Sequence, residues 1–331
     1  MVELTIPSLD QINNLKVFKK YGKEASITDF SILLGADIND SYYTKEGNTL
    51  EDRAGYYWTR TDHGDNDARI VYFTGHGTYD RVDIRDVCVR PSLPYSSISN
   101  ISENITKIED GILEVEYGEY PQKAVSKDLQ QKLEVLYKNK NLNKTGKTYT
   151  TDSRKYDEYY NEYYNEFQTQ THVEYEYNGK KYIRFKDNSY FGSNEFILSN
   201  GEKYRDGDYI WVEVSPIKWI VDEKEDIAIT KKLIFLGVQF NRERNYKGNF
   251  KSTNMYKFLN EIFIKDILPS KIVAEYNEDI IKTKRENLKI ALKEYADLVK
   301  KFNKNNNPTK FKKELEILED IEQKVYKICK Y

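Results

Sequence analysis

The sequence predicts an α+β fold: a mixed β-sheet core with flanking helices and a C-terminal helical hairpin. Runs rich in β-branched and aromatic residues, separated by polar turns, occupy residues 56–89 and 112–229. Apolar residues at helical spacing precede and interrupt these runs, and two helical stripes fill the chain from residue 269 onward. We therefore expect three parts, which comprise residues 1–104, 105–268 and 269–331.

The first part begins with helix and continues with strands. Ser8 is a favoured N-cap residue and apolar residues then recur at helical spacing, so residues 8–35 are predicted to be helical. Turns are predicted at the polar residues 62–67 and at Gly75-His76-Gly77. The strands expected around these turns are 57–59, 70–73 and 82–89.

The second part repeats this mixture of elements. Its strongest local signal is Asn178-Gly179 between two alternating runs, which predicts a β-hairpin over 173–185. Residues 140–171 are dominated by Asn, Thr, Tyr, Lys and Glu and are predicted to form a flexible insert. The other expected elements are strands at 112–117, 209–214, 219–221 and 227–229, a helix marked by Leu129, Leu133 and Leu136, and a helix over 255–264.

The third part is predicted to be an antiparallel helical hairpin. One apolar stripe repeats every seven residues from Ile281 to Phe302, and a second follows the break at 305–308. We expect this hairpin to pack on its own domain. Residues 282–313 also contain 11 Lys and Arg residues, a basic run suited to an acidic partner or to nucleic acid.

Composition narrows the classes of protein. The 52 Lys and Arg residues nearly balance 54 Asp and Glu, for a net charge of −2, which argues against nucleic-acid binding over the whole surface. Cys88 and Cys329 are too few for a disulfide framework or a metal cluster, which favours a reducing compartment or a thiol without a role. No apolar run spans a membrane and the first 15 residues do not have a signal-peptide pattern. We expect a cytoplasmic or phage-particle-associated protein without membrane contact.

The sequence contains no catalytic constellation. His63 and His76 lie near several aspartates, but their spacing matches no metal-ligand pattern, so a metal-dependent enzyme is the least favoured hypothesis. Nucleophile elbows of the G-x-S-x-G type are absent, and Gly75-His76-Gly77 is too short to cradle a phosphate. We therefore predict a protein that is not an enzyme and that uses no cofactor and no metal.

A candidate ligand face lies between Tyr57 and Cys88. Tyr, Trp and Arg, the residue types that anchor protein interfaces, are interleaved there with polar residues. The competing interpretation is an ordinary half-exposed sheet, because the chain contains 29 tyrosines. The predicted ligand-binding residues are Tyr57, Trp58, Arg60, His63, Asn66, Tyr72, His76, Tyr79, Arg81, Asp83 and Arg85.

Residues 55–61 (GYYWTRT), 67–71 (DARIV) and 89–93 (VRPSL) resemble the closing half of C-type-lectin-like domains. The resemblance is to formylglycine-generating-enzyme-like modules of bacteria and phages, including uncharacterised gut-bacterial proteins. A segment similar to the family's opening half comes later, at 115–122 (VEYGEYPQ) and through 209–260, so the halves stand in reversed order. The resemblance implies a C-type-lectin-like core in residues 25–268, as one permuted domain or two partial ones.

The resemblance also bears on function. The family's enzymes oxidise a substrate cysteine with a cysteine pair, whereas this chain has only Cys88 in the matching region, so that activity is not expected. Relatives diversified by retroelements vary the segment between the two motif strands and use it to bind ligands. Residues 72–88 occupy that segment here.

We therefore predict a non-catalytic ligand-binding module that binds a protein through residues 57–88. The alternative is a phage or mobile-element inhibitor of a host defence complex that acts through the Lys-rich C-terminal helices. In that alternative, nucleic acid is the other partner that the basic run could contact.

Overall fold

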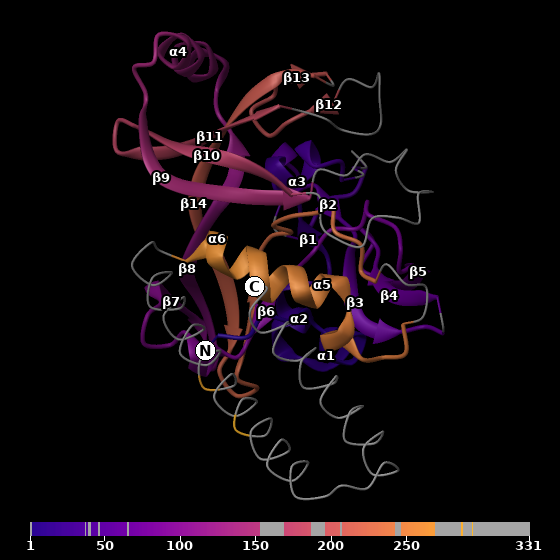
Figure 1. The fold of residues 1–331 in the computed structure, drawn as a ribbon. Helices are drawn as coiled ribbons and strands as arrows, with labels where there is room; N and C mark the ends of the chain where they lie inside the picture. The colour runs from indigo at the N-terminus through magenta and orange to yellow at the C-terminus, as the bar shows by residue number, and fades with distance from the viewer. Residues whose placement is uncertain are drawn as a thin grey trace, which may run out of the picture. The chain divides into compact units, whose positions relative to one another are not determined.

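The computed structural model describes residues 2–152, 169–186, 196–241 and 246–268, apart from positions 37, 39, 40, 46, 65 and 206, together with Glu286 and Lys293 (Figure 1). The chain divides into two units, Met1–Leu268 and Pro269–Tyr331. The first unit is α+β with many strands and few helices. The predicted boundary at 104/105 falls inside it. The predicted C-terminal hairpin lies outside the described residues.

Two long antiparallel strands form the spine of the main sheet. Strand β14 (Tyr209–Asp222) pairs with β8 (Ile112–Ala124) along nearly its whole length. On its other edge β14 pairs first with β11 (Lys180–Lys186) and then with β15 (Ile227–Thr230). The runs predicted as separate strands at 209–214 and 219–221 are therefore one continuous strand that serves two parts of the sheet.

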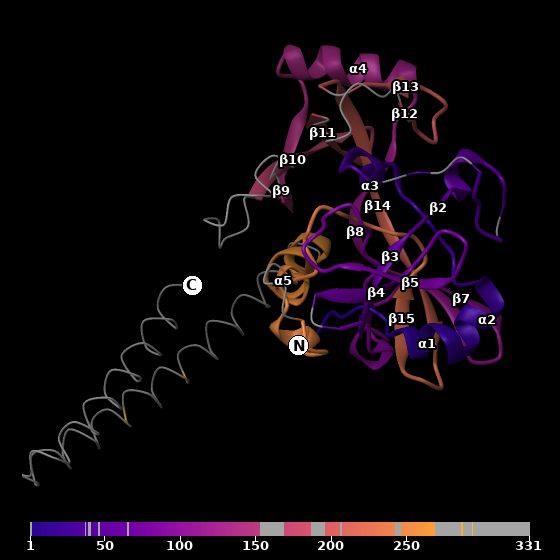
Figure 2. The same ribbon diagram turned by 90° about the vertical axis from the view of Figure 1, so that its right-hand side faces the viewer.

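The part beside β11 is called the distal arm here; it consists of α4 (Lys127–Lys138), β9 (Asn143–Asp152), β10 (Thr169–Tyr177) and β11. Asn178 and Gly179 both have positive φ, as a tight type I′ turn requires, so the predicted hairpin is confirmed. Helix α4 lies at the end of the β8–β14 spine (Figure 2). Its Leu133 packs in a buried cluster with Tyr175 of β10 and Trp211 of β14.

The prediction of a loop over 140–171 was wrong where β9 and the start of β10 lie. Strand β9 has a polar sequence, and most of its side chains are exposed to solvent. Tyr149 and Thr151 are the exceptions that point inward and are buried. Its backbone pairs with β10 from Thr169 to Glu176, which satisfies the amide groups of a run with little apolar content. Residues 153–168 lie outside the described part.

The opposite end of the spine carries the shorter strands. Strand β15 pairs with β6 (Ser92–Leu93), and the other edge of β8 pairs with β7 (Glu103–Glu109), most of whose residues are exposed. Because β6 comes from the first predicted part and β15 from the second, residues on both sides of position 104 build one sheet.

A separate three-stranded sheet contains the candidate face. It is formed by β3 (Tyr57–Asp62), β4 (Asp67–Val71) and β5 (Gly77–Arg81) in that order. The prediction of a strand over 82–89 was wrong, because this stretch is mostly turns and bends. The strand of this region is β5, which begins at Gly77, the last residue of the predicted glycine turn. Val82, Val87 and Val89 are each buried although they do not belong to a strand. Apolar residues spaced in this way resemble the alternating pattern of a strand.

The N-terminal region is less helical than predicted. Three short helices, α1 (Leu9–Asn14), α2 (Lys16–Tyr21) and α3 (Asp29–Leu33), replace one long segment. The cap at Ser8 is confirmed, with a reciprocal bond from Gln11. Helices α1 and α2 are separated at Leu15, whose backbone is extended. Between α2 and α3, β1 (Ala25–Ser26) pairs with β2 (Ala54–Gly55).

The unit ends with helical turns that cover the sheet. The helix predicted over 255–264 is α5 (Asn254–Phe258), a π-helical turn (Leu259–Phe263) and α6 (Ile264–Ile267). Phe263 packs against Phe235 and Tyr120 of the core, with ring centroids 4.6 and 5.0 Å apart. The remaining elements are the 3₁₀ turns Leu50–Asp52, Tyr95–Ser97 and Phe250–Ser252 and the strands β12 (Phe196–Ile197) and β13 (Lys203–Tyr204).

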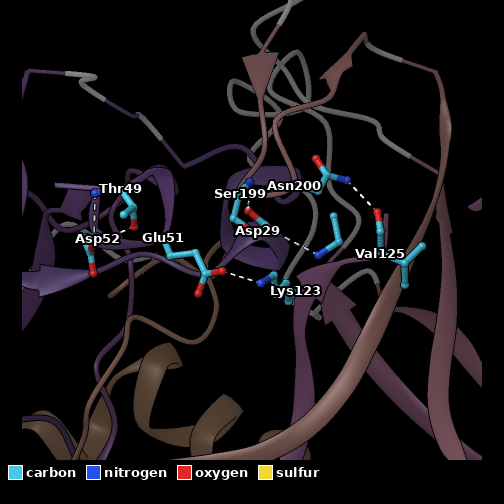
Figure 3. A network of polar contacts seen from close by, with 9 residues as sticks. Asp29, Thr49, Glu51, Asp52, Lys123, Val125, Ser199 and Asn200 are labelled. Atoms are coloured by element: carbon cyan, nitrogen blue, oxygen red, sulfur yellow. Dashed lines mark hydrogen bonds and ion pairs between the residues drawn. The ribbon is translucent and has the colours of Figure 1, made fainter. Parts of the chain in front are cut away.

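A buried carboxylate ties three segments together (Figure 3). Asp29, the first residue of α3, accepts hydrogen bonds from the Ala124 amide at 2.9 Å and from the Ser199 amide and hydroxyl at 2.8 and 2.6 Å. The Asn200 side-chain amide donates to the Val125 carbonyl at 2.7 Å. The β12–β13 turn is thereby fixed against α3 and the end of β8.

Candidate binding interface

The structure sorts the eleven predicted ligand-binding residues by exposure. Buried residues cannot touch a ligand without rearrangement of the core, whereas exposed ones can. Tyr57, Trp58 and Asp83 are buried; Arg60, His63 and Arg85 are half-buried; Asn66, Tyr72, His76, Tyr79 and Arg81 are exposed.

The buried members form the scaffold. The Tyr57 hydroxyl donates to the Lys23 carbonyl at 2.7 Å and accepts from Arg90 Nη1 at 3.2 Å. The Arg90 guanidinium lies over the rings of Phe18 and Tyr57, 5.2 and 5.3 Å from their centroids. Burial raises the pKa of Tyr57. The YYW and VRP motifs therefore meet in the core, and Tyr57 supports the face without belonging to its surface.

Trp58 and Asp83 are likewise held inside. Trp58 is fully buried, with its ring centroid 5.1 Å from that of Phe240. Asp83 forms an ion pair with Arg81 at 3.3 Å, and its backbone carbonyl accepts from the Gln239 side chain at 2.6 Å. The buried Asp83 carboxylate therefore helps to hold the exposed Arg81 side chain in place.

The two half-buried arginines among the predicted residues, Arg60 and Arg85, hydrogen-bond to distant segments of the chain. Arg60 Nη2 donates to Gln11 Oε1 at 3.0 Å, and the Arg60 carbonyl accepts from the Tyr246 hydroxyl at 2.6 Å. Arg85 Nε donates to the Gly237 carbonyl at 2.7 Å. These contacts direct both guanidinium groups toward the protein.

Four of the six remaining members gather at one end of the β3–β5 sheet, and we call His63, Asn66, Tyr79 and Arg81 the tip cluster. The rings of His63 and Tyr79 lie against each other, with centroids 4.0 Å apart and planes inclined by 32°. The Tyr79 side chain is 51% exposed, and the Arg81 side chain is equally exposed two residues along β5. The Asn66 carbonyl accepts a hydrogen bond from the Val82 amide at 2.9 Å. This bond joins the β3–β4 turn, which contains Asn66, to the end of β5.

Arg69 extends the tip cluster, although the sequence argument missed it. It pairs directly with Tyr79 across β4 and β5, so both side chains leave the same face of the sheet. Asp80 lies on the opposite face, where burial, followed by the charges of Asp86 and Asp67, raises its pKa in spite of the Arg81 amide, which donates to it. Together with Arg69, the tip cluster thus presents two aromatic rings in contact and two guanidinium groups.

Tyr72 and His76 lie at the other end of the sheet, in the β4–β5 turn. The Tyr72 ring centroid is 3.8 Å from that of Phe73 and 5.9 Å from that of Tyr56. His76 Nδ1 is 3.1 Å from Thr74 Oγ1. The predicted ligand face is therefore divided between two ends of the sheet.

A buried polar group in the distal arm carried no sequence signal. The Tyr149 hydroxyl donates to Glu174 at 2.6 Å, and the Thr150 amide donates to Asp266 at 2.6 Å. Burial raises the pKa of Asp266 to about 7 and lowers that of His172 to about 4. Tyr149, Thr150, His172 and Glu174 lie in a Tyr- and Thr-rich stretch without a motif, and the pairing of β9 with β10 brings them together. Asp266 comes from α6, which packs against β9.

Among the described residues, no group of three or more His, Cys, Asp or Glu side chains is placed to hold a metal ion. No helix in this part of the chain is long and apolar enough to cross a membrane. Comparison of the chain with protein-family models, with curated proteins and with solved structures found no match.

Proposed function

We propose that the protein is a non-catalytic binding module, of C-type-lectin-like architecture, that recognises a protein ligand through the tip cluster. The observation that carries this proposal is the contact of the exposed Tyr79 ring with the half-buried His63 ring, beside the exposed Arg81. Tyrosine and arginine dominate the energetics of protein interfaces because they combine apolar area with directional polar groups.

Two further observations support the proposal. The motif residues Tyr57 and Arg90 are buried and bonded to each other, as expected of a scaffold whose surface residues can vary independently. Strands β4 and β5 hold Arg69, Tyr79 and Arg81 in fixed register, so the surface is organised before a ligand binds.

Site-specific photocrosslinking tests the proposal with the full chain. Benzoylphenylalanine is placed at Tyr79, at Lys300 in the basic C-terminal run and at Val135, an exposed residue of α4 that serves as the control. The proposal expects one protein to be crosslinked from position 79 and not from position 135. Crosslinking from position 300 alone would instead favour the inhibitor hypothesis.

The affinity of that crosslinked partner is then measured. Tyr79→Ala and Arg81→Ala should each weaken binding by about 2 kcal/mol or more, whereas Lys300→Ala/Lys301→Ala should change it little. Circular dichroism establishes that each variant is folded. Unchanged affinity in the first two variants would refute the proposed site.

A further inference from the structure

Four aromatic rings cluster at the end of the β3–β5 sheet opposite the tip cluster. Phe73 stacks on Tyr42, with ring centroids 4.7 Å apart, and also contacts Tyr72, whose ring centroid is 3.8 Å away and whose plane is inclined by 38°. Phe73 is buried, but Tyr42 and Tyr72 are 38% and 39% exposed. Tyr56 is buried behind them, 5.9 Å from the Tyr72 ring. The chain therefore presents tyrosine rings that are fixed by stacking and accessible from the surface.

A carboxylate lies beside this stack. Glu24 precedes β1, and continuing the β1–β2 register by one residue places it opposite Tyr56. Its Oε1 is 2.9 Å from where a Cβ on Gly75 would stand, and Gly75 belongs to the turn that carries Tyr72 and Phe73. A side chain at Gly75 would displace the carboxylate, so the turn makes room for it.

The Glu24 carboxylate is incompletely satisfied. Its Oε2 is buried and has no hydrogen-bond partner in the described part of the chain. The Lys45 side chain passes close by, with its Cδ 3.3 Å from the Cβ position of Gly22, but it donates no hydrogen bond to Glu24 Oε2. A buried carboxylate oxygen without a donor is unfavourable, and a cation that approaches the half-buried side chain would relieve this.

We propose that Glu24, Tyr42, Tyr56, Tyr72 and Phe73 form a second binding site, which accepts an arginine or lysine side chain of a partner protein. A cation is attracted to the face of an aromatic ring and to a carboxylate, and this site offers both. The site is independent of the tip cluster, because it stands on different residues at the other end of β4 and β5.

The test is an NMR titration of the full chain with Nα-acetyl-arginine methylamide and its uncharged citrulline analogue. We expect millimolar binding of the arginine compound, with shift changes at residues 24, 42, 56 and 72–75, and at least about tenfold weaker binding of citrulline. The lysine compound should bind at the same residues. Equal binding of arginine and citrulline would overturn the proposal.

Variants separate the carboxylate from the rings. Glu24→Gln keeps the shape and should weaken arginine binding about three- to tenfold, while Tyr72→Leu keeps apolar bulk without a π face and should weaken it about two- to fivefold. Glu225→Gln, at an exposed carboxylate outside both sites, is the matched control and should bind like the wild type. Wild-type affinity in Glu24→Gln, or an equal loss in Glu225→Gln, would refute the second site.

Discussion

In the distal arm, Arg184 donates to both oxygens of Glu134 at 2.9 and 2.8 Å and lies over the rings of Tyr137 and Tyr209. In the tip cluster, Arg81 and Tyr79 are half exposed, and Arg81 pairs with one buried aspartate. Both regions use arginine and tyrosine on antiparallel strands. The difference is α4, which covers one face of the distal arm and leaves those residues to stabilise the fold, whereas nothing in the described chain covers the tip cluster.

The first prediction compares aromatic residues in the two regions. Trp211→Ala should lower the free energy of unfolding by about 3–5 kcal/mol, because Trp211 is fully buried under α4. Tyr79→Ala should change it by no more than about 0.5 kcal/mol. Urea unfolding monitored by circular dichroism measures both. A large loss in Tyr79→Ala would mean that the tip cluster is structural, contrary to the proposed function.

The second prediction concerns pH and the buried side of the distal arm. Because burial raises the pKa of Asp266 from 3.8 to about 7, the folded state holds this proton more tightly than the unfolded chain. The protonated Asp266 carboxyl group contributes in full to the free energy of unfolding below pH 4. This contribution, up to about 4 kcal/mol, is lost as pH rises through 7. Asp266→Asn, which retains an acceptor for the Thr150 amide, should be more stable than the wild type at pH 8 and equally stable at pH 4.

His172 has the opposite pH dependence, so the difference between wild type and Asp266→Asn is the quantity to measure. Its lowered pKa means that its contribution is present above pH 6.5 and is lost as pH falls toward 4, equally in both proteins. Denaturant midpoints at half-unit pH intervals give this difference. Parallel curves for the two proteins would show that the Asp266 carboxyl group is not buried in solution.

The third prediction compares arginines. Arg184→Gln should cost about 1–3 kcal/mol of stability, because it breaks a two-bond contact with Glu134 and leaves a partly buried carboxylate. Arg81→Gln should cost less, about 1 kcal/mol or below, because the half-exposed Arg81 side chain pairs with Asp83 through a single contact and glutamine keeps a donor for that carboxylate. Thermal unfolding at matched pH and salt provides the measurement. Equal losses in the two variants would remove the distinction between the regions.

The sequence predicts what is encoded locally. The Asn178-Gly179 turn and the Ser8 cap depend on a few adjacent residues, and both are found where expected. Strand β9 was missed because its stability comes from pairing with β10, which composition does not reveal. Residues 82–89 were mistaken for a strand because burial of isolated valines imitates alternation.

The residues of the candidate site likewise include some that the sequence could identify and others that only the tertiary structure reveals. Tyr79 and Arg81 could be proposed from the sequence because tyrosine and arginine are typical interface anchors, although the strand that carries them, β5, was not predicted. Burial of Tyr57 and Trp58 depends on Phe18, Arg90 and Phe240, which are distant in sequence. Glu24 and Tyr42 lie beside the turn that contains Tyr72 only because of tertiary contacts, which the sequence does not reveal. In a chain with 29 tyrosines, residue type alone could not select them.

The division of β14 between β11 and β15 also affects how this protein can change in length. The chain leaves the spine after Ala124 and returns at Tyr209, and Ala124 pairs with Val212, so the exit and entry points are adjacent. Everything between them, including the distal arm and the β12–β13 turn, is topologically an insertion at the tip of a hairpin. Segments placed this way can be lengthened, shortened or exchanged during evolution while the strands that carry them keep their register.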